Sequence, residues 1–253
     1  MAAGDSRSTN YDTVASTFDR RYTLHSYDGV CEAIEGFLGS FVLSAILEVG
    51  CGTGHWLQVI GGRAPIVAGM DPSTNMLARA RAAAPHARLV RARAEQLPWR
   101  GAAFDRIVCV NALHHFADRE AFFAEARRVL RPGGGLLTVG LDPHTERDEW
   151  WVYDFFPETR AIDRARFAPV RIIRGEITKA GFAWSESFEA HHLETQLPLR
   201  ETFPNGIDRS FTSQLTVLSE DEFQRGLSRV RDAGNDLSLI ADLRFYATLG
   251  WLT

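Results

Sequence analysis

The sequence has little cysteine and no long apolar run. Among its 253 residues the cysteines are Cys31, Cys51 and Cys109, an odd number without C-x-x-C spacing. This excludes a disulfide framework or a cysteine-ligated metal as the organising feature. No run reaches the roughly 18 apolar residues of a membrane span, and residues 1–10 lack the apolar core of a signal peptide. We therefore expect a soluble, cytoplasmic protein that has no membrane partner.

An excess of positive charge is also missing. Lys and Arg number 28 against 32 Asp and Glu, which gives a net charge of −4 and a pI near 6.1. Proteins that bind nucleic acids usually carry a basic face, so this balance disfavours a nucleic-acid partner. Hydrophobic residues make up 45% of the chain and charged residues 24%, as is typical of a globular protein with a sizeable core.

Apolar runs alternate with helical patterns through the first part of the chain. β-branched runs predict strands, and apolar residues spaced three and four apart predict helices. Strands are expected at residues 45–49, 65–70, 87–91, 104–110, 136–141, 182–192 and 237–249. Helices are expected at 11–22, 30–41, from 55 onward, and at 73–84, 119–131, 171–181 and 220–233. This alternation predicts an α/β fold with a doubly wound, mostly parallel sheet.

The length suits one α/β domain with added segments. We expect a single domain over residues 1–253, with an N-terminal helical lid at 1–42 and a ligand-binding core at 43–142. Irregular insertions are expected at 143–169 and 193–235, where they would cover a substrate. The first insertion is rich in aromatic residues, which could form the wall of a dry site or the core of a helical segment.

The first expected strand runs directly into three glycines. Residues 46–54 read ILEVGCGTG. Glycine tolerates positive φ and lets the backbone approach a ligand closely, so a turn of this kind between strand and helix predicts a nucleotide-type site at the carboxyl edge of the sheet. The dinucleotide fingerprint G-x-G-x-x-G needs glycine at position 55, where His55 stands. The spacing therefore argues against NAD, and it leaves Glu48 unexplained.

Further motifs follow this turn in a recognisable order. They are EVGCGTG (48–54), an aspartate ending the second strand (71), RAEQLP (93–98), FDRIVCVN (104–111) and RVLRPGG (128–134). In order and spacing they resemble the motifs of the class I S-adenosylmethionine-dependent methyltransferases of the small-molecule type. The resemblance covers roughly residues 45–141. It implies a Rossmann-like fold with a seven-stranded sheet whose last strand is antiparallel, and S-adenosyl-L-methionine as cofactor, with S-adenosyl-L-homocysteine as product.

The resemblance also implies a set of cofactor-binding residues. They are Tyr22, Glu48, Gly50, Cys51, Gly52, Thr53, Gly54, Asp71, Pro72, Met76, Ala94, Glu95 and Asn111. Asp71 would accept hydrogen bonds from both ribose hydroxyls, and Asn111 would lie near the methionine end. Glu48 would organise the glycine loop and the methionine moiety.

The adenine end departs from the family pattern. Arg93 occupies the family's aspartate position, so adenine recognition would fall to the backbone at Ala94 or to Glu95. The N-terminal stretch that contains Tyr11 and Arg21 would form a lid over the cofactor.

A general base is needed only when the methyl acceptor keeps its proton at neutral pH, and histidine is the usual choice. His115 and, less strongly, His114 follow the fourth expected strand and are the candidate catalytic bases, although histidines there also pack or contact cofactor. His144, His191 and His192 are weaker candidates. No third ligand at suitable spacing joins a histidine pair, so we expect no metal site.

The leading interpretation is a methyltransferase that modifies O, N or C of a small molecule by in-line displacement. One alternative is a methyltransferase for a macromolecule, RNA or protein, although the stretch NALH at 111–114 lacks the Pro-Pro-aromatic element expected of a tRNA or DNA enzyme. Others are a non-catalytic protein that binds S-adenosylmethionine for regulation, and an NAD oxidoreductase. The patterns leave open the acceptor, the need for a base, and whether the protein is a monomer or a homodimer.

Overall fold

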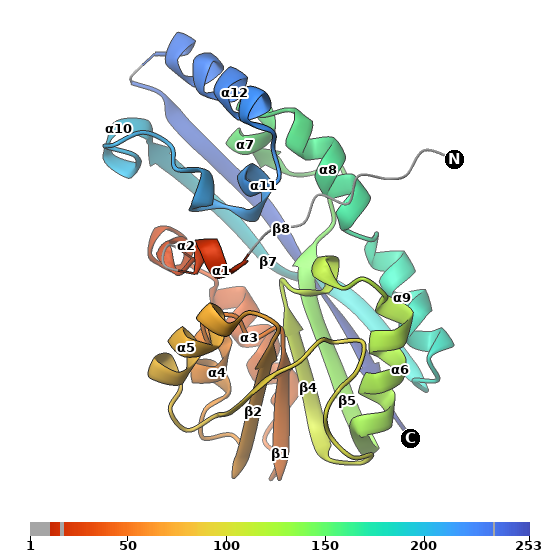
Figure 1. The fold of residues 1–253 in the computed structure, drawn as a ribbon. Helices are drawn as coiled ribbons and strands as arrows, with labels where there is room; N and C mark the ends of the chain where they lie inside the picture. Colours follow the sequence, from red (N-terminus) through yellow and green to blue (C-terminus); the bar gives the residue numbers. More distant parts are fainter. Residues whose placement is uncertain (1–10, 16–17, 235) are drawn as a thin grey trace.

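The computed structural model describes residues 11–15, 18–234 and 236–253. Its centre is a twisted sheet in the order β3-β2-β1-β4-β5-β8-β6, with β7 also paired to β8 (Figure 1). The strands are β1 (Ala45–Val49), β2 (Ile66–Asp71), β3 (Arg88–Arg91), β4 (Phe104–Val110), β5 (Leu130–Leu141), β6 (Glu149–Trp150), β7 (Trp184–Pro198) and β8 (Ser238–Trp251). Strands β1 to β5 are parallel to their neighbours in this group, and β8 is antiparallel to β5, β6 and β7.

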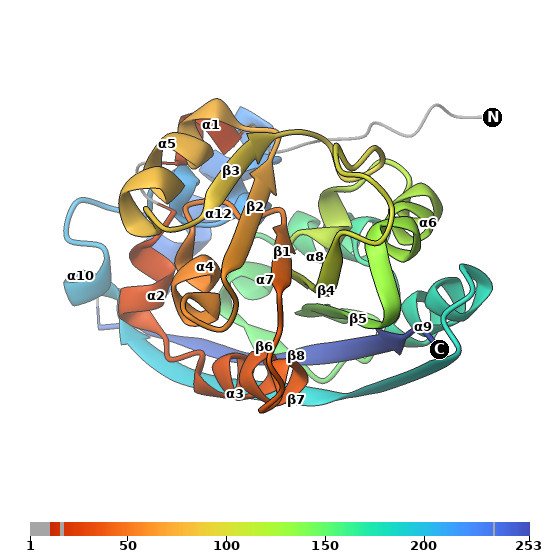
Figure 2. The same ribbon diagram turned by 90° about the horizontal axis from the view of Figure 1, so that it is seen from below.

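Helices cover both faces of the sheet (Figure 2). The α-helices are α1 (Tyr11–Val14), α2 (Arg20–Leu24), α3 (Asp28–Leu38), α4 (His55–Ile60), α5 (Thr74–Ala83), α6 (Arg119–Val129), α7 (Trp151–Phe155), α8 (Glu158–Arg166), α9 (Val170–Lys179), α10 (Leu199–Thr202), α11 (Ser213–Thr216) and α12 (Glu220–Asp232). Short 3-10 turns are η1 (Leu113–His115) and η2 (Arg209–Phe211).

The central strand β1 shows why the sheet is covered on both sides. Successive side chains of a strand point to opposite faces. Ile46 packs into one core with Ile34 of α3 and Leu57 of α4, whereas Leu47 packs into a second core with Phe122 of α6. Every residue of β1 is buried. The apolar run predicted as a buried strand is therefore a strand between two helical layers.

The two longest strands carry the second half of the chain away from the parallel strands. β7 and β8 pair from Trp184↔Trp251 to Pro198↔Ser238 and form a ribbon that extends beyond β5. Helices α7, α8, α10, α11 and α12 lie on this extension, above the carboxyl ends of the parallel strands (Figure 1). We call this group, residues 149–166 and 199–232, the upper layer. Helices α1 and α2 lie between the carboxyl edge of the sheet and the upper layer, with α1 in contact with both α5 and η2 (Figure 1).

The expected α/β architecture is confirmed, with corrections in the parts outside the core. The predicted seven-stranded sheet has an eighth, two-residue strand, β6. The strand expected at 182–192 continues as β7 to Pro198, because residues 193–198 pair with β8, so the second insertion is not irregular from 193. The first insertion contains β6, α7 and α8.

The helix expected at 11–22 is instead two short helices, α1 and α2, with residues 16–17 outside the described part of the chain. Tertiary contacts override the helical periodicity here. Tyr11 contacts His115 after β4, whereas Tyr22 stacks on His55 at the start of α4. One straight helix would place both rings on one stripe.

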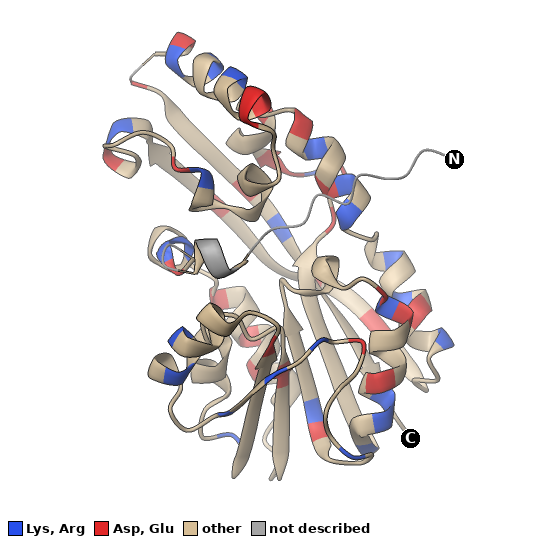
Figure 3. Ribbon diagram, in the orientation of Figure 1, with Lys and Arg blue, Asp and Glu red and all other residues tan. Residues whose placement is uncertain are grey.

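The surface of the helices mixes both signs of charge. Acidic and basic positions intermingle on α6, α8, α9 and α12 rather than forming a basic face (Figure 3). Among the helices that the structure describes, none combines the length and the apolar character needed to cross a membrane.

Candidate cofactor site

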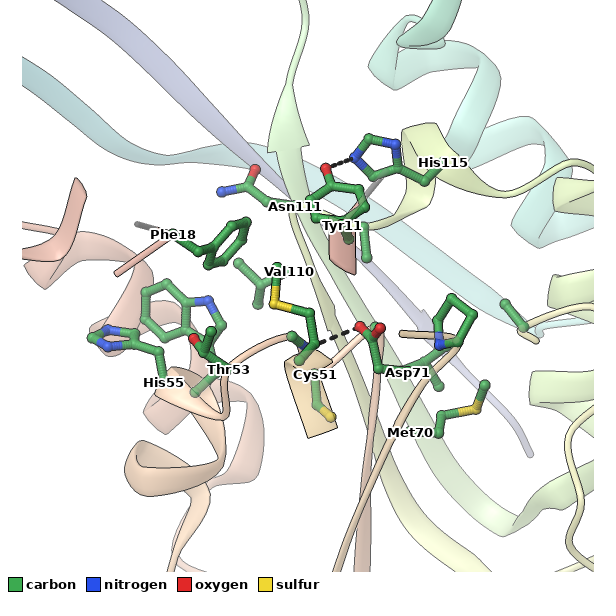
Figure 4. A pocket seen from close by; sticks show the side chains of 18 of the residues that line it. Tyr11, Phe18, Cys51, Thr53, His55, Met70, Asp71, Val110, Asn111 and His115 are labelled. Atoms are coloured by element: carbon green, nitrogen blue, oxygen red, sulfur yellow. Dashed lines mark hydrogen bonds between the residues drawn. The ribbon is translucent and has the colours of Figure 1, made fainter. Parts of the chain in front are cut away.

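A cavity of about 310 Å³ opens at the carboxyl edge of the parallel strands. Its walls come from the turn after β1, the end of β2, the loop after β3, the turn after β4 and the N-terminal segment (Figure 4). This is the edge where open α/β sheets bind their ligands, and the volume lies at the lower end of the range for small-molecule sites. We call it the cofactor cavity.

The glycine turn after β1 forms the floor of this cavity. Gly50, Gly52 and Gly54 have φ values of 75°, 50° and 88°, a region that L-residues with a Cβ rarely adopt. A Cβ on Gly50 would lie 2.3 Å from the Cβ of Ala112. The turn therefore requires glycine for its backbone shape and for its close approach to the turn after β4.

Asp71 at the end of β2 holds the turn in place. Its carboxylate accepts hydrogen bonds from the backbone N–H of Gly52 at 3.0 Å and of Ser73 at 2.9 Å. Ser73 caps α5 by accepting from the N–H of Met76. A carboxylate offers about four lone-pair positions, so these contacts are compatible with hydrogen bonds to a ligand diol. The Asp71 side chain points into the cavity (Figure 4).

Glu48 lies beneath the turn and is the least satisfied group of the site. The residue is fully buried, and neither carboxylate oxygen has a hydrogen-bond partner among the described residues. Burial, followed by the charge of Asp71, raises the pKa of Glu48 well above its ordinary value. Buried polar groups are normally paired. Glu48 itself does not line the cavity, but Val49 and Gly50, which follow it, do. An orphaned carboxyl group directly behind the lining fits a ligand that brings a positive charge, such as the ammonium group of a methionine moiety.

The N-terminal segment covers the same cavity from above. Tyr11, Phe18, Arg21 and Tyr22 all line it, and Tyr22 stacks on His55 with ring centroids 3.5 Å apart. Sequence patterns pointed to Tyr11, Arg21 and Tyr22 as a lid, and the structure places all of them over the cavity.

A polar contact joins this segment to the glycine turn. The Thr53 hydroxyl donates to the carboxylate of Asp19, which also pairs with Arg79 at 3.3 Å. The N-terminal segment is therefore in direct contact with the glycine turn.

Apolar side chains contribute to the cavity wall near the loop after β3. Met70, Met76 and Phe116 line the cavity and give surface suited to a flat base. The Glu95 carboxylate accepts from the backbone N–H of Ala117 at 2.8 Å and lies 3.5 Å from Arg93. Both Ala94 and Glu95 line the cavity, so both groups suggested for adenine recognition stay predictions.

His115 lies at the wall of the cavity but is tied to its neighbours. Nε2 is hydrogen-bonded to the hydroxyl of Tyr11 (Figure 4), and Nδ1 lies 3.4 Å from a guanidinium nitrogen of Arg166. Because arginine only donates, Nδ1 accepts and Nε2 carries the proton. Burial, Arg166 and Arg21 lower the pKa of His115 to about 3. The side chain is thus neutral and weakly basic in this arrangement.

The other histidines considered as bases do not line the cofactor cavity. His114 stacks on Phe167 with centroids 3.9 Å apart, and burial followed by His115 lowers its pKa well below the ordinary value. The remaining candidates hold backbone or surface groups: His144 contacts the carbonyl of Phe167 and His191 that of Ser26.

His192 belongs to an exposed cluster on the β7–β8 ribbon. With Glu194 and Asp242 it brings possible ligand atoms within 4.8 Å of one another. Asp242 already pairs with Arg244 at 2.7 Å. The expectation of no metal site stays a prediction.

Most of the predicted cofactor residues meet at the cavity. They are Tyr22, Gly50, Cys51, Gly52, Thr53, Asp71, Pro72, Met76, Ala94, Glu95 and Asn111. Glu48 lies beneath the lining, and Gly54 instead packs against Ala80 of α5. Sequence patterns missed Phe18, His55, Trp56 and Phe116, which also line the cavity. No motif assigned them a role. Only the place of Phe18 depends on how the N-terminal segment folds over the sheet, since His55 and Trp56 begin α4 and Phe116 follows η1. Their roles, like those of the predicted residues, remain predictions.

A second, smaller cavity of about 90 Å³ adjoins the first. The two share Tyr11, Phe18, Arg21 and Asn111. The rest of its wall comes from the connection between α2 and α3, His114, the end of β5, the middle of β7 and β8, Phe167 and the upper layer. We call it the second chamber. An occupant would lie between the cofactor cavity and the upper layer.

Fold and site together define a Rossmann-like protein with a nucleotide-type ligand site at the carboxyl edge of its sheet. Residues 47–138 match the family model described as "Methyltransferase domain". With the order of the motifs, this shows that the motif-bearing part of the chain is similar to the class I S-adenosylmethionine-dependent methyltransferases. The predicted resemblance is confirmed over residues 47–138, and S-adenosylmethionine is the cofactor of the family that this part resembles.

Known relatives act on different kinds of molecule. The chain is 33% identical over 157 residues to a phthiotriol/phenolphthiotriol dimycocerosates methyltransferase of Mycobacterium leprae, covering 60% of this chain and 56% of that protein. It is 32% identical over 165 residues to a tRNA U34 carboxymethyltransferase of Pseudoalteromonas atlantica, covering 56% and 50%. The chain thus spans about half the length of these curated relatives.

A solved structure shows the fold over nearly the whole chain. Phosphoethanolamine N-methyltransferase 2 of Haemonchus contortus, in complex with S-adenosyl-L-methionine, aligns with a TM-score of 0.61 at 17% identity. The alignment covers 95% of this chain and 57% of that protein. The likeness therefore includes the second half of the chain, beyond the residues that the family model matches.

Proposed function

We propose that the protein is an enzyme that transfers a methyl group from S-adenosylmethionine to a small molecule. The observation that carries the proposal is the buried Glu48 carboxyl group, which has no partner among the described residues. Glu48 directly precedes the residues of the glycine turn that line a cavity of ligand size. A cofactor with an ammonium group supplies the missing partner. Asp71 is positioned to bind the ribose, and the backbone near Ala94 to bind the adenine.

The cofactor supplies a methyl carbon activated by a sulfonium; a nucleophile's lone pair forms the new bond as the C–S electron pair returns to sulfur. The task of the chain is then alignment and exclusion of water. Tyr11, Phe18 and Tyr22 cover the cofactor cavity. Because positive charge is dispersed during transfer, a site with aromatic walls suits the reaction.

A protonated acceptor must still lose its proton. His115 and His114 remain the candidate bases from the sequence. The low pKa of both and the bonds of His115 to Tyr11 and Arg166 support instead a positioning role for His115 in the arrangement described. An acceptor that is already ionised needs no base.

Two features favour a small acceptor over a macromolecule. The second chamber, where an acceptor would meet the cofactor, is about 90 Å³, and charges of both signs intermingle on the helices. The N-terminal segment at 1–42 and the insertions at 143–169 and 193–235 would serve as lid and substrate cover. The alternative of an RNA substrate takes its support from the tRNA-modifying relative. The cytoplasmic location stays a prediction.

The proposal is tested by incubating the protein with S-adenosylmethionine and a panel of small phenols, carboxylates and amines, and measuring S-adenosylhomocysteine by mass spectrometry. We expect formation of S-adenosylhomocysteine that depends on one class of acceptor. Tight binding of the cofactor without turnover on any acceptor, including unmodified tRNA, would instead support the non-catalytic regulatory alternative.

A further inference from the structure

The second chamber has an unusual charge pattern for an acceptor site. Its lining is largely apolar and aromatic, and includes Tyr27, Trp150, Phe167, Phe211 and Phe245. Among the described residues that line it there is no aspartate or glutamate, and the permanently charged side chain is Arg21. A ligand in this chamber would therefore experience a positive field inside an apolar wall.

Arg21 lies where the two cavities meet, since it lines both. Its Nε donates to the carbonyl of Phe18 at 3.0 Å, and its guanidinium lies 3.8 Å over the ring of Phe18. Within the described chain no carboxylate forms an ion pair with it. The contacts with Phe18 hold the guanidinium group in place. They leave the N–H donors at its planar end without an anionic partner among the described residues. This planar group matches a carboxylate in a bidentate manner.

The titratable side chains in the lining add no negative charge. Behind the lining, the carboxyl group of Asp163 is hydrogen-bonded to Gln214 and is opposed by Arg166 at 3.9 Å. Burial and Arg21 lower the pKa of His25 to about 4, and burial raises the pKa values of Tyr11 and Tyr27. These side chains are therefore uncharged near neutral pH. His25 also has a buried Nδ1 without a partner among the described residues, so it can share a hydrogen bond with a polar ligand atom. Gln214, opposite, is occupied by Thr212 and Ser213.

We propose that the methyl acceptor is a small, mainly apolar or aromatic acid, whose anionic group pairs with Arg21 while its body lies in the second chamber. The proposal rests on the proposed function and deepens it. A cationic amine would meet a like charge without a carboxylate to offset it, so amines of ethanolamine type are poor acceptors. The carboxylate of the cofactor could also reach Arg21, because the residue lines both cavities, and the experiment separates the two sources.

The test measures the binding of matched ligands by calorimetry. The ligands come in sets of three, called triplets, and each triplet consists of an acid, the neutral amide and the amine that share one hydrocarbon skeleton. The skeletons are benzene, naphthalene and octane. Each triplet is titrated with and without saturating S-adenosylhomocysteine, so the charge preference is measured even if the cofactor does not bind. We expect the acid of at least one triplet to bind at least tenfold more tightly than its amide, and the amine to bind most weakly.

The Arg21→Gln variant should abolish the preference for the acid. Arg20→Gln is the matched control: Arg20 is the adjacent residue in α2 and lines neither cavity, so this variant should keep the preference. Circular dichroism verifies folding. No preference for an acid in any triplet, or the same preference in Arg21→Gln, would overturn the proposal.

Whether Arg21 binds the carboxylate of the cofactor is tested with two ligands, S-adenosylhomocysteine and 5′-methylthioadenosine. Of the two, 5′-methylthioadenosine lacks the amino-acid moiety and so has no carboxylate. We expect Arg21→Gln to change the affinity for each by less than threefold. A loss of tenfold or more for S-adenosylhomocysteine alone would assign Arg21 to the cofactor and refute the acceptor proposal. If the wild-type protein binds neither compound, the proposed function fails, whereas the triplets without cofactor still report on the charge preference of the chamber.

Discussion

Replacing Glu48 by leucine should change stability and affinity in opposite directions. Glu48 is fully buried, and both of its carboxylate oxygens lack partners among the described residues. An unsatisfied buried polar group costs about 1–3 kcal/mol. Leucine removes that cost and occupies much of the same volume, so Glu48→Leu should raise the free energy of unfolding of the cofactor-free protein by about 1–3 kcal/mol.

The same substitution should weaken cofactor binding. A hydrogen bond to a charged group contributes about 1.5–3 kcal/mol, and each 1.4 kcal/mol is a factor of ten in affinity. Loss of the contact between Glu48 and the ammonium group should therefore weaken S-adenosylhomocysteine by roughly 10- to 150-fold. Affinity for 5′-methylthioadenosine, which has no ammonium group, should be nearly unchanged.

The pH dependence follows from the direction of the pKa shift. Burial and Asp71 raise the pKa of Glu48 well above the ordinary value of 4.5. The folded protein therefore holds this proton more tightly than the unfolded chain. The contribution of Glu48 to stability is present below about pH 4.5 and is lost as the pH rises through the folded pKa. Binding of an ammonium group favours the ionised carboxylate, so it should release a proton where free Glu48 is protonated.

Urea denaturation measures stability, and calorimetry in two buffers of different ionisation enthalpy measures affinity and proton release. Glu48→Gln keeps the size of the side chain and serves as the control for shape: it should lose affinity as the leucine variant does. The reasoning is refuted if Glu48→Leu lowers stability by more than 1 kcal/mol, or if it binds S-adenosylhomocysteine as the wild type does.

Three further outcomes are expected, each measurable by calorimetry, denaturation or steady-state turnover. Asp71→Ala removes acceptors for Gly52 and Ser73 and should lower cofactor affinity at least tenfold in a folded protein; normal binding would show that the ribose site is misplaced. Gly52→Val forces a β-branched residue to φ 50°, costing about 1–2 kcal/mol and weakening binding. His115→Ala should lower turnover more than affinity. With a pKa near 3, His115 should give wild-type turnover no inflection between pH 5 and 8; unchanged turnover in the variant would eliminate any role.

The sequence was sufficient to predict the core of the fold because local and global signals agree there. The run at β1 is apolar at consecutive positions and ends in glycines, which a strand buried on both faces and followed by a ligand turn requires. Asp71 could be placed from its position at the end of β2. The glycines and Asp71 lie within a few positions of the end of a strand, and the apolar pattern of the sequence marks where that strand ends.

The upper layer and the surroundings of His115 could not be predicted in this way. The continuation of β7 to Pro198 depends on its pairing with β8, forty or more residues later in the chain, and nothing local to residues 193–198 indicates a strand. Likewise, the low pKa of His115 is caused by burial and by Arg166 and Arg21, which come from distant segments. Sequence spacing placed His115 near the cavity but could not show that its nitrogens are engaged.

The central claim is that the cavity at the carboxyl edge of the sheet binds S-adenosylmethionine rather than a dinucleotide. It is tested most directly by calorimetric titration of the purified protein with S-adenosylmethionine, S-adenosylhomocysteine and NAD. We predict binding of both adenosyl ligands at one site per chain and none of NAD at the same concentrations. Preference for NAD, or no binding of either adenosyl ligand, would contradict the account.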